Sequence, residues 1–305
     1  MLARDDGRLT EAVLIAVTGA TGEMGRRVAE RLGARGVEMR LIVRDRAKAP
    51  DIVGAEVAEA SDYGATEEMR RAFDGADTVF LVPGRESANR VEQHKSAVDA
   101  AVAAGVERIV YLSFVDARAD TTFTLGRHHW ATEEHIRGAD VAYTFPRMQL
   151  YLDFIPTFAG PDGVIAGPAD DGRLAPVLRD DIADVVEVVL TEEGHEGRAY
   201  DITGAEAFTL AEAAERMSRA SGKRIVFRDE TLEEAYAARS VYGAPDWEVE
   251  GWVTSYLAIA AGDLDLVTTT VRDLAGHDPG TLEEYISTTP DALAHVTVPA
   301  RSRLG

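Results

Sequence analysis

The residues best placed to do chemistry in this 305-residue chain form a glycine-rich loop near its start. Gly19, Gly22 and Gly25 follow an apolar run of strand length, and helical spacing begins directly after them. The first glycine permits a tight turn, the second lets a pyrophosphate approach the backbone, and the third lets helix and strand pack closely. The start of a helix offers free amides and a partial positive charge to phosphates. The pattern predicts a dinucleotide site; the alternative is an ordinary strand-to-helix turn that is rich in glycine.

The end of the second expected strand indicates which dinucleotide would bind. An NAD site usually has an acidic residue there, which holds the ribose 2′-hydroxyl. This strand ends Val43-Arg44-Asp45, and a guanidinium can pair with a 2′-phosphate and stack on adenine. We therefore expect Arg44 to favour NADP(H). Two alternatives stay open, because Asp45 could serve part of the NAD role and Arg44 could be a solvated surface charge.

The usual proton donor of such enzymes is missing. Ordinary short-chain dehydrogenases use Tyr-x-x-x-Lys, in which the Lys lowers the pKa of the Tyr and the Tyr protonates the carbonyl oxygen. The three lysines of this chain, Lys48, Lys95 and Lys223, have Arg, Val and Arg four residues before them. Substrates that depend on strong acid assistance are therefore not expected.

His129 is the remaining candidate acid. It lies on an expected helix from Gly126 to Ile136, one turn before Glu133, and an imidazole of ordinary pKa near 6.5 could donate a proton near neutral pH. We expect His129 to face the nicotinamide; a structural histidine is the alternative. No metal site is expected at this pair, since His and Glu one turn apart are more often a hydrogen-bonded surface turn.

The elements that must position these residues alternate between strand and helix. Expected strands cover Ala12–Val17, Met39–Val43, Ala55–Ala60, Asp77–Val82, Arg108–Phe114, Val141–Phe145 and Ala199–Ile202, and expected helices include Thr66–Phe73, Val91–Ala104, Gly126–Ile136 and Asp180–Leu190. This order predicts an α/β fold, a Rossmann-like doubly wound parallel sheet. Residues 1–150, with 175–204 returning to them, would form an NADP-binding domain. Residues 151–174 and 205–305 would form a smaller, mostly helical domain that covers the substrate.

Composition limits the partners and the compartment. The net charge is −21, and an acidic surface repels nucleic acid phosphates and anionic lipid. Cysteine is absent, which fits a reducing compartment. No apolar run approaches the roughly 20 residues of a membrane helix, and the first residues carry no signal-peptide pattern. We expect a cytoplasmic protein without nucleic acid or membrane partners.

Several segments resemble a known family. The loop from Val17 to Gly25 resembles the NmrA-like branch of the atypical short-chain dehydrogenases. Later segments agree; they are Gln93-His94 with the helix after it, Ile109–Ser113, His129–Glu133 and Tyr143–Arg147. They look most like the group of NAD(P)H:quinone oxidoreductases and triphenylmethane-dye reductases. The resemblance covers about residues 12–155 well and the remainder loosely.

The resemblance implies a role for each residue of the site. Thr18, Gly19, Thr21, Gly22, Glu23 and Met24 would hold the pyrophosphate, with Gly25 completing the loop. Arg44 would hold the 2′-phosphate and Asp62 would meet adenine. At the nicotinamide end would lie Val82, Pro83, Ser113, Phe114 and Pro146, the last of these after the sixth strand. Gln149 and Tyr151 would open the substrate pocket. Each has a bland alternative, such as a proline that ends a strand or a tyrosine that fills the core.

The expected function is an NADPH-dependent reductase that transfers hydride to a quinone-like or other electron-poor aromatic substrate, with His129 and Tyr151 as catalytic residues. A quinone suits the site because its reduced oxygen needs little help from a strong acid. Two alternatives remain, a non-catalytic NADP(H)-binding sensor or regulator, as in part of this family, and a biosynthetic reductase of polycyclic aromatics. The protein would act on small molecules as a monomer or homodimer.

Overall fold

A parallel sheet organises the first two thirds of the chain, of which the computed structural model describes residues 13–297. Seven strands follow the order β3-β2-β1-β4-β5-β7-β10, and every pairing along this path is parallel. The strands are β1 (Ile15–Val17), β2 (Met39–Val43), β3 (Ala55–Glu59), β4 (Thr78–Leu81), β5 (Arg108–Tyr111), β7 (Ala142–Met148) and β10 (Arg198–Ile202). The doubly wound sheet is confirmed, including the return of β10. The strand order reverses between β1 and β4, where folds of this type bind ligands beyond the carboxyl ends of the strands.

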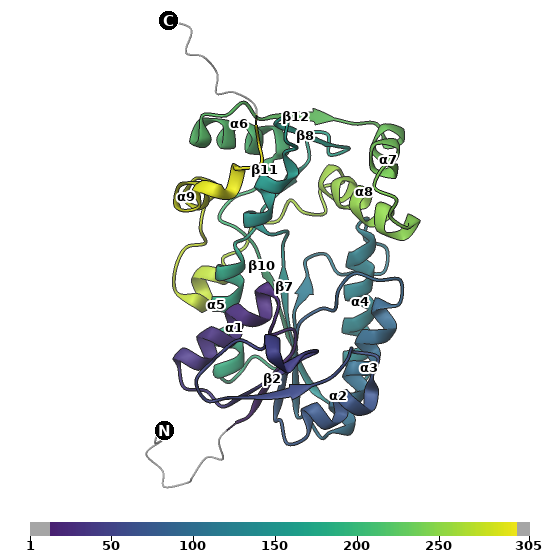
Figure 1. Ribbon diagram of the computed structural model, residues 1–305, viewed down its shortest axis with the longest axis vertical. Coiled ribbons are helices and arrows are strands. Elements are labelled where there is room, and N and C mark those ends of the chain that lie inside the picture. Colours follow the sequence, from purple (N-terminus) through teal and green to yellow (C-terminus); the bar gives the residue numbers. More distant parts are fainter. Residues whose placement is uncertain (1–12, 298–305) are drawn as a thin grey trace, which may run out of the picture.

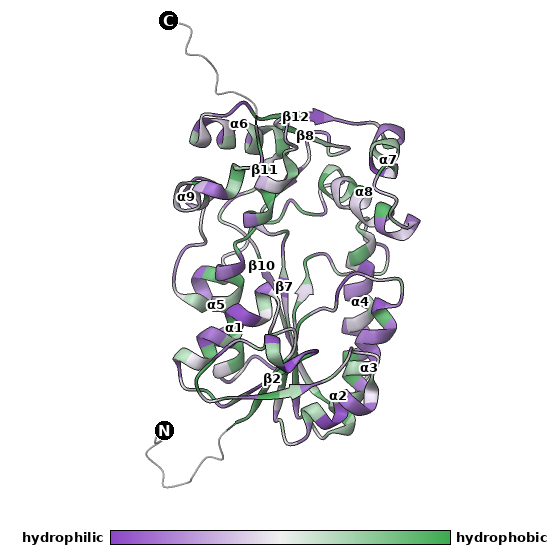
Figure 2. Ribbon diagram, in the orientation of Figure 1, coloured by the Kyte–Doolittle hydropathy of each residue, from purple (hydrophilic) through white to green (hydrophobic). Residues whose placement is uncertain are grey.

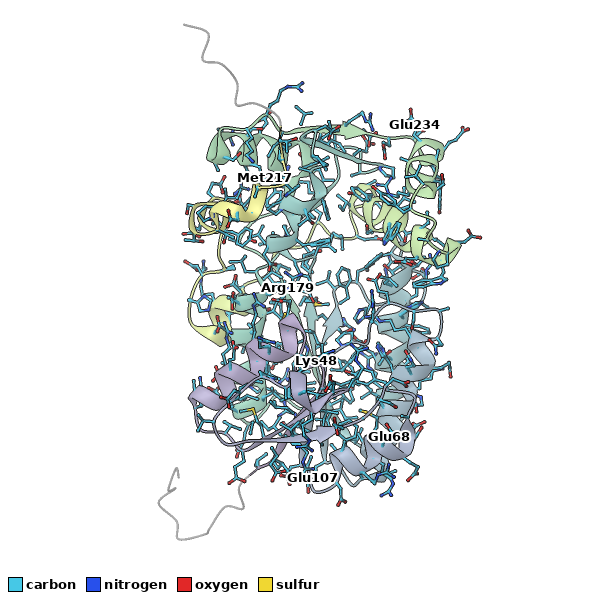
Figure 3. All side chains as sticks on the ribbon, in the orientation of Figure 1. Lys48, Glu68, Glu107, Arg179, Met217 and Glu234 are labelled. Carbon is cyan, nitrogen blue, oxygen red and sulfur yellow. The ribbon has the colours of Figure 1, made fainter. Side chains whose placement is uncertain are left out.

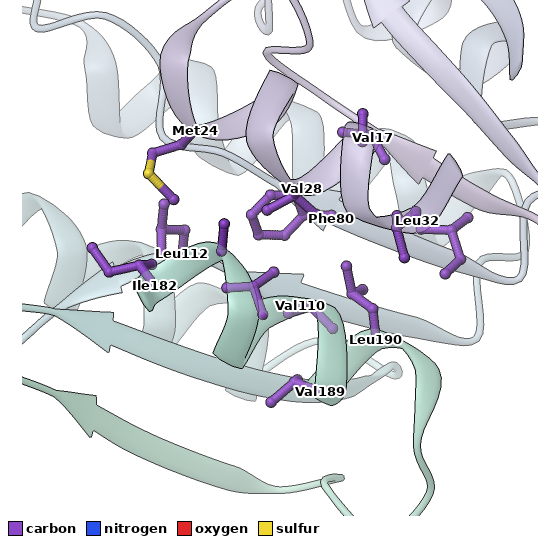
Figure 4. Packing of buried hydrophobic residues seen from close by; sticks show 14 of the residues in the cluster. Val17, Met24, Val28, Leu32, Phe80, Val110, Leu112, Ile182, Val189 and Leu190 are labelled. Carbon is purple, nitrogen blue, oxygen red and sulfur yellow. The ribbon is translucent and has the colours of Figure 1, made fainter. Parts of the chain in front are cut away.

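Helices cover both faces of this sheet (Figure 1). On one face lie α1 (Glu23–Ala34) and α5 (Arg179–Thr191); on the other lie α2 (Thr66–Phe73), α3 (Arg90–Ala103) and α4 (Thr124–Arg137). Figure 4 shows the first interface, in which Val28 and Leu32 of α1 meet Val189 of α5 over Phe80 and Val110 of the sheet. Strands buried on both faces need near-continuous apolar runs, as in β1 and β4, and green stretches run through the sheet in Figure 2.

Two strands differ most from the expectation, and the others by at most two described residues at their ends. The expected strand Arg108–Phe114 is divided into β5 and β6 (Ser113–Phe114), both of which pair with β7. β7 also extends three residues beyond its expected end, so Pro146 lies inside this strand and not after it. A proline can stand there because pairing toward β5 stops at Thr144 and resumes toward β6 only at Arg147, so the missing N–H falls in a gap. Ala12, expected to open β1, lies outside the described residues.

The rest of the described chain forms a smaller unit above the sheet in Figure 1. Its helices are α6 (Leu210–Ser221), α7 (Leu232–Ser240), α8 (Asp246–Ala260) and α9 (Leu282–Thr288), with the short turns η2 (Leu152–Phe158) and η4 (Pro290–Leu293). The turn η3 (Val271–Ala275) packs instead against α5, in the core of the sheet. The unit also contains two small sheets. They pair β8 (Val164–Gly167) with β12 (Val226–Asp229) and β9 (Arg173–Leu174) with β11 (Phe208–Thr209). Capping boxes Thr-x-x-Glu open α6, α7 and α9, which fixes where these helices start. The proposed boundary between two domains stays a prediction.

Candidate active site at the carboxyl edge of the sheet

The glycine loop between β1 and α1 has the shape that a phosphate needs. The amide of Gly22 donates to the carbonyl of Gly19 at 2.9 Å, and Gly19 has a φ of 62°, which side chains rarely adopt. A Cβ atom on Gly25 would lie 2.3 Å from the carbonyl oxygen of Gly19, so only glycine fits there. No side chain caps the start of α1 at Gly22. The first-turn amides therefore lack a side-chain partner and suit a pyrophosphate.

The side chains of this loop contribute less than its backbone. Met24 is buried in the core beside α5, and Thr21 is exposed. The carboxylate of Glu23 pairs with Arg27, and that hydrogen bond lowers the pKa of Glu23. Its negative charge is thus balanced by Arg27 on the same helix face.

Thr18 ties the strand ends together. Its hydroxyl donates to the carbonyl of Phe80 at 3.1 Å and accepts from the Val82 amide at 2.9 Å and from the Tyr63 hydroxyl at 2.7 Å. These three partners leave the buried hydroxyl no capacity for a ligand. The Thr18 hydroxyl therefore supports the loop, and the expected contact of this residue with a pyrophosphate stays a prediction.

Among the charged side chains that directly follow β2, that of Arg44 is left available for a ligand. Asp45 accepts from the amide of Ala47 at 3.0 Å, which caps the short turn η1 (Arg46–Lys48), and its carboxylate lies 3.6 Å from the Lys48 ammonium. The Arg46 guanidinium donates to the carbonyl of Val57. Arg44 is exposed and has no hydrogen bond or ion pair within residues 13–297. The arrangement fits a 2′-phosphate at Arg44. The Asp45 carboxylate is engaged by Ala47 and Lys48 and is therefore poorly placed to hold the ribose 2′-hydroxyl of NAD.

The expected adenine and ribose residues lie at the same edge. Asp62 is exposed beyond β3, where its carboxylate accepts from the amide of Gly64 at 2.6 Å. Val82 and Pro83 directly follow β4 and are half-buried. The single proton of the Tyr63 hydroxyl is shared between the Thr18 hydroxyl and the carbonyl oxygen of Val82, which lies 2.6 Å away, so the ends of β3 and β4 are held together.

Near the expected position of the nicotinamide, Ser113 is paired with Glu133. From the sequence, Glu133 was considered only as the residue one turn after His129. The Ser113 hydroxyl donates to Glu133 at 2.6 Å, and this carboxylate is fully buried. Glu133 also accepts from Arg147 at 2.6 and 2.8 Å and from Arg137 at 2.8 Å. The spacing of Glu133 and Arg137, one helical turn apart, was the signal available in the sequence. The Phe114 ring lies nearby, tilted against the His129 ring with the two ring centroids 6.0 Å apart.

His129 is buried behind β5. Its side chain is 3% exposed; Nδ1 lies 3.0 Å from the Tyr111 hydroxyl and Nε2 lies 3.5 Å from Nη2 of Arg90. Burial, assisted by the charge of Arg90, lowers the pKa of His129 well below 6.5. The ordinary pKa on which the sequence argument relied is therefore wrong for this residue, which is a neutral imidazole at neutral pH.

Tyr151 and Gln149 join the sheet to the smaller unit. The guanidinium of Arg179, labelled in the middle of the molecule in Figure 3, stacks 4.0 Å from the ring centroid of Tyr151. Burial raises the pKa of Tyr151 to about 12, so its hydroxyl stays protonated. Gln149 is fully buried and donates to the carbonyl of Leu264 at 3.1 Å. It therefore links two segments and, contrary to expectation, forms no pocket wall.

Arg90 is the residue that the sequence argument missed. It is the first residue of α3 and is 5% exposed, with Nε donating to the carbonyl of Gly84 at 3.0 Å. No described residue bonds to its Nη1, which is buried. A cation in the first turn of a helix opposes the helix dipole, and this unfavourable placement was the available signal.

Comparisons with known proteins agree with this geometry. Residues 11–248 match the NmrA-like family. Quinone oxidoreductase 2 of Escherichia coli is 33% identical over 283 residues, which cover 90% of this chain and 98% of that protein. The NADPH complex of the quinone oxidoreductase QOR2 from the same organism superposes with a TM-score of 0.82 at 32% identity, over 90% of this chain and 99% of that one. The NADP(H) complex of Citrobacter sp. triphenylmethane reductase gives 0.81 at 32% identity, with the same coverage.

One further finding concerns membranes: within residues 13–297, no helix is long and apolar enough to cross a bilayer.

The family match extends over the sheet, the glycine loop and the residues that surround His129. The relatives named above match along nearly their whole length. The chain therefore belongs to the NmrA-like family.

Proposed function

We propose that this protein is an NADPH-dependent reductase that transfers hydride to a quinone-like or other electron-poor aromatic substrate without a Tyr-x-x-x-Lys pair. The glycine loop and the open Arg44 fit the phosphates of NADP(H). The structures of the relatives from E. coli and Citrobacter, which are complexes with NADPH and NADP(H), support that choice of cofactor. When bound, NADPH supplies the hydride.

One observation carries the choice of acceptor. The two expected catalytic residues, His129 and Tyr151, and the Tyr111 hydroxyl beside His129 are all poorly suited to giving up a proton near neutral pH. The pKa of His129 lies well below its ordinary value, while burial raises the pKa of Tyr151 to about 12 and that of Tyr111 further still. An acceptor must therefore tolerate negative charge on its reduced oxygen. Quinones and similar conjugated systems do so, because the charge is delocalised.

The role of this chain is then to position two flat molecules. The first-turn amides of α1 and Arg44 would fix the phosphates, while Val82, Pro83, Phe114 and Pro146 would hold the reactive ring against the sheet edge. Holding donor and acceptor about 3–3.5 Å apart accounts for much of the rate in such reactions. The smaller unit, from residues 151–174 and 205–305, would cover the acceptor. We place this activity in the cytoplasm, on free small molecules, in a monomer or homodimer.

The test is NADPH oxidation with 1,4-benzoquinone, a triphenylmethane dye and a simple aliphatic ketone. We expect turnover of the quinone and the dye and little turnover of the ketone, because acid assistance worth about 10²–10⁴ in rate is missing. Faster turnover of the ketone would contradict the proposed acceptor. Tight NADPH binding without turnover of any acceptor would identify a cofactor sensor instead.

A further inference from the structure

Arg90 combines a positive charge, deep burial and an incomplete set of partners. Its Nε and Nη2 point to the Gly84 carbonyl and to Nε2 of His129, whereas Nη1 is buried with no hydrogen-bond partner among the described residues. No carboxylate within residues 13–297 forms an ion pair with it. Buried charges are normally paired because removing an ion from water is costly. The unused Nη1 donors therefore indicate a place for an anionic or strongly polar ligand atom.

The position of Arg90 connects it with the proposed reaction. Its bond to Gly84 places the guanidinium beside the loop that follows Val82 and Pro83. Its Nη2 group lies 3.5 Å from Nε2 of His129 on α4. Arg90 therefore lies among the loops at the carboxyl edge, next to His129. This is the edge at which a doubly wound sheet presents its ligands.

The described polar groups around Arg90 use their hydrogen-bond donors within the protein, so Arg90 is the strongest free donor beside His129. The Gly84 amide donates to Nε2 of His94 at 2.9 Å, so this ring carries its proton on Nδ1, which faces the Thr132 hydroxyl at 2.9 Å. Ser113 donates to Glu133. The Nε2 atom of neutral His129 faces a guanidinium, which can only donate hydrogen bonds. His129 thus accepts and orients, while Arg90 retains spare N–H groups.

We propose that Arg90 is a catalytic residue whose Nη1 group binds the acceptor oxygen on which negative charge collects during hydride transfer, with His129 as its positioning residue. This inference rests on the proposed function and names a specificity feature of that site, a preference for acceptors that become anionic at oxygen. The hydride adds to the acceptor with both its electrons. An electron pair of the acceptor's conjugated system moves to the carbonyl oxygen, which takes one proton from water. Tautomerisation, in which the ring C–H proton is lost and the second oxygen is protonated, then gives the hydroquinone.

A pair of stable ligands tests the charge preference apart from turnover. 2-Hydroxy-1,4-naphthoquinone is an anion at neutral pH, whereas 2-methoxy-1,4-naphthoquinone has nearly the same shape and no charge. Binding of each to the NADP⁺ complex, in which no hydride is present, is measured by calorimetry. We expect the wild type to prefer the anion by about ten- to a hundredfold, as for a charge-assisted hydrogen bond.

The variants assign that preference to Arg90. Arg90→Met should bind both ligands equally and should lower kcat for 1,4-benzoquinone by about 10²–10³, as when one oxyanion donor is removed, with its affinity for NADP⁺ unchanged. Arg90→Lys should keep part of the anion preference. Arg85→Met removes one charge from an exposed position of the same loop and should keep all of it. If Arg90→Met does not fold, the comparison of Arg90→Lys with wild type decides, since a donor of different geometry must weaken the preference.

The possible results separate this inference from the proposed function. Equal binding of the two naphthoquinones by wild type, or an undiminished preference in both Arg90 variants, would overturn the role of Arg90 even if quinones are reduced. An Arg90-dependent preference in a protein that reduces none of the acceptors would support the anion site and refute the proposed reductase activity.

Discussion

The Ser113 hydroxyl and the Glu133 carboxylate are joined by a hydrogen bond of 2.6 Å in which serine is the donor. Glu133 is fully buried, and the two guanidiniums of Arg137 and Arg147 compensate its charge. The hydroxyl that ends this part of the sheet is thus directed into the protein. It cannot donate to a substrate at the same time, which again leaves Arg90 as the available donor.

Glu133→Gln should destabilise the protein by about 2–3 kcal/mol. The amide is nearly isosteric, but it removes the charge that compensates two partly buried guanidiniums. Urea unfolding of the purified protein measures the change. Glu134→Gln is the matched control, because Glu134 is exposed and pairs with Arg137 at the surface; it should cost less than about 0.5 kcal/mol. Equal losses in both variants would mean that the buried network adds nothing.

NADPH should bind more tightly than NADH by about ten- to a hundredfold, since a charge-assisted contact with the 2′-phosphate is worth about 1.5–3 kcal/mol. Arg44→Ala should remove this preference. Titration of both cofactors into each variant provides the measurement. Arg46→Ala is the control, because that guanidinium is engaged with the Val57 carbonyl. A preference that survives Arg44→Ala but not Arg46→Ala would transfer selection to Arg46.

Substitutions of two loop glycines should have different consequences. In Gly22→Val the first added atom would meet only the Gly19 carbonyl oxygen, at 3.3 Å, so the fold should survive while the side chain occupies the phosphate position. In Gly25→Ala the added atom would overlap the backbone of Gly19 and Thr18, so stability itself should fall by about 1–3 kcal/mol or more. Thermal unfolding and NADPH titration separate the two effects. NADPH binding retained by Gly22→Val would place the phosphates elsewhere.

The rate of quinone reduction should not vary with pH between about 6 and 8. His129 is neutral throughout this range because burial lowers its pKa, and an arginine keeps its charge. His129→Ala should lower kcat by about ten- to a hundredfold through loss of support for Arg90, without changing the profile. Steady-state kinetics over that range give the answer. An inflection near pH 6.5 that disappears in His129→Ala would make the imidazole the acid after all.

Stability should fall as the solution is acidified below about pH 6.5. Burial lowers the pKa values of His94 and His129 in the folded protein, so below the unfolded value only the unfolded chain takes up these protons. Their stabilising contribution is complete above the unfolded pKa and is lost as the pH falls toward the folded pKa, by about 1.4 kcal/mol per pH unit for each histidine. Urea unfolding at pH 7.5 and 5.5 should show this slope. His94→Gln should reduce the slope by about one proton, whatever its effect on absolute stability, and an unchanged slope would refute the assignment.

The sheet could be predicted because its evidence is local. Strands such as Met39–Val43 are short apolar runs closed by turn residues, and Thr66–Phe73 has helical spacing; both were found at their expected bounds. The extension of β7 through Pro146 could not be predicted, since it depends on a gap in the pairing with neighbouring strands. Short strands such as β9 are defined by distant partners and carry too few residues for a pattern.

The site was less predictable than the fold because pKa values and pairings arise from three-dimensional packing. The sequence gives no sign that Thr18 would be saturated by Phe80, Val82 and Tyr63, or that Gln149 would reach Leu264. Asp45 illustrates the same limit. An aspartate at this position could have held the ribose of NAD. Its carboxylate instead caps the turn η1, which only the structure shows.

The three hydrogen bonds of Thr18 have a consequence for the thermodynamics of ligand binding. They fix the ends of β1 and β4 and the Tyr63 ring during folding, so these parts of the site lose their conformational freedom before a cofactor arrives. Association with a dinucleotide then orders few additional backbone torsions, and less of the interaction free energy is offset by entropy. The same coupling makes the affinity of the site depend on the integrity of the sheet edge.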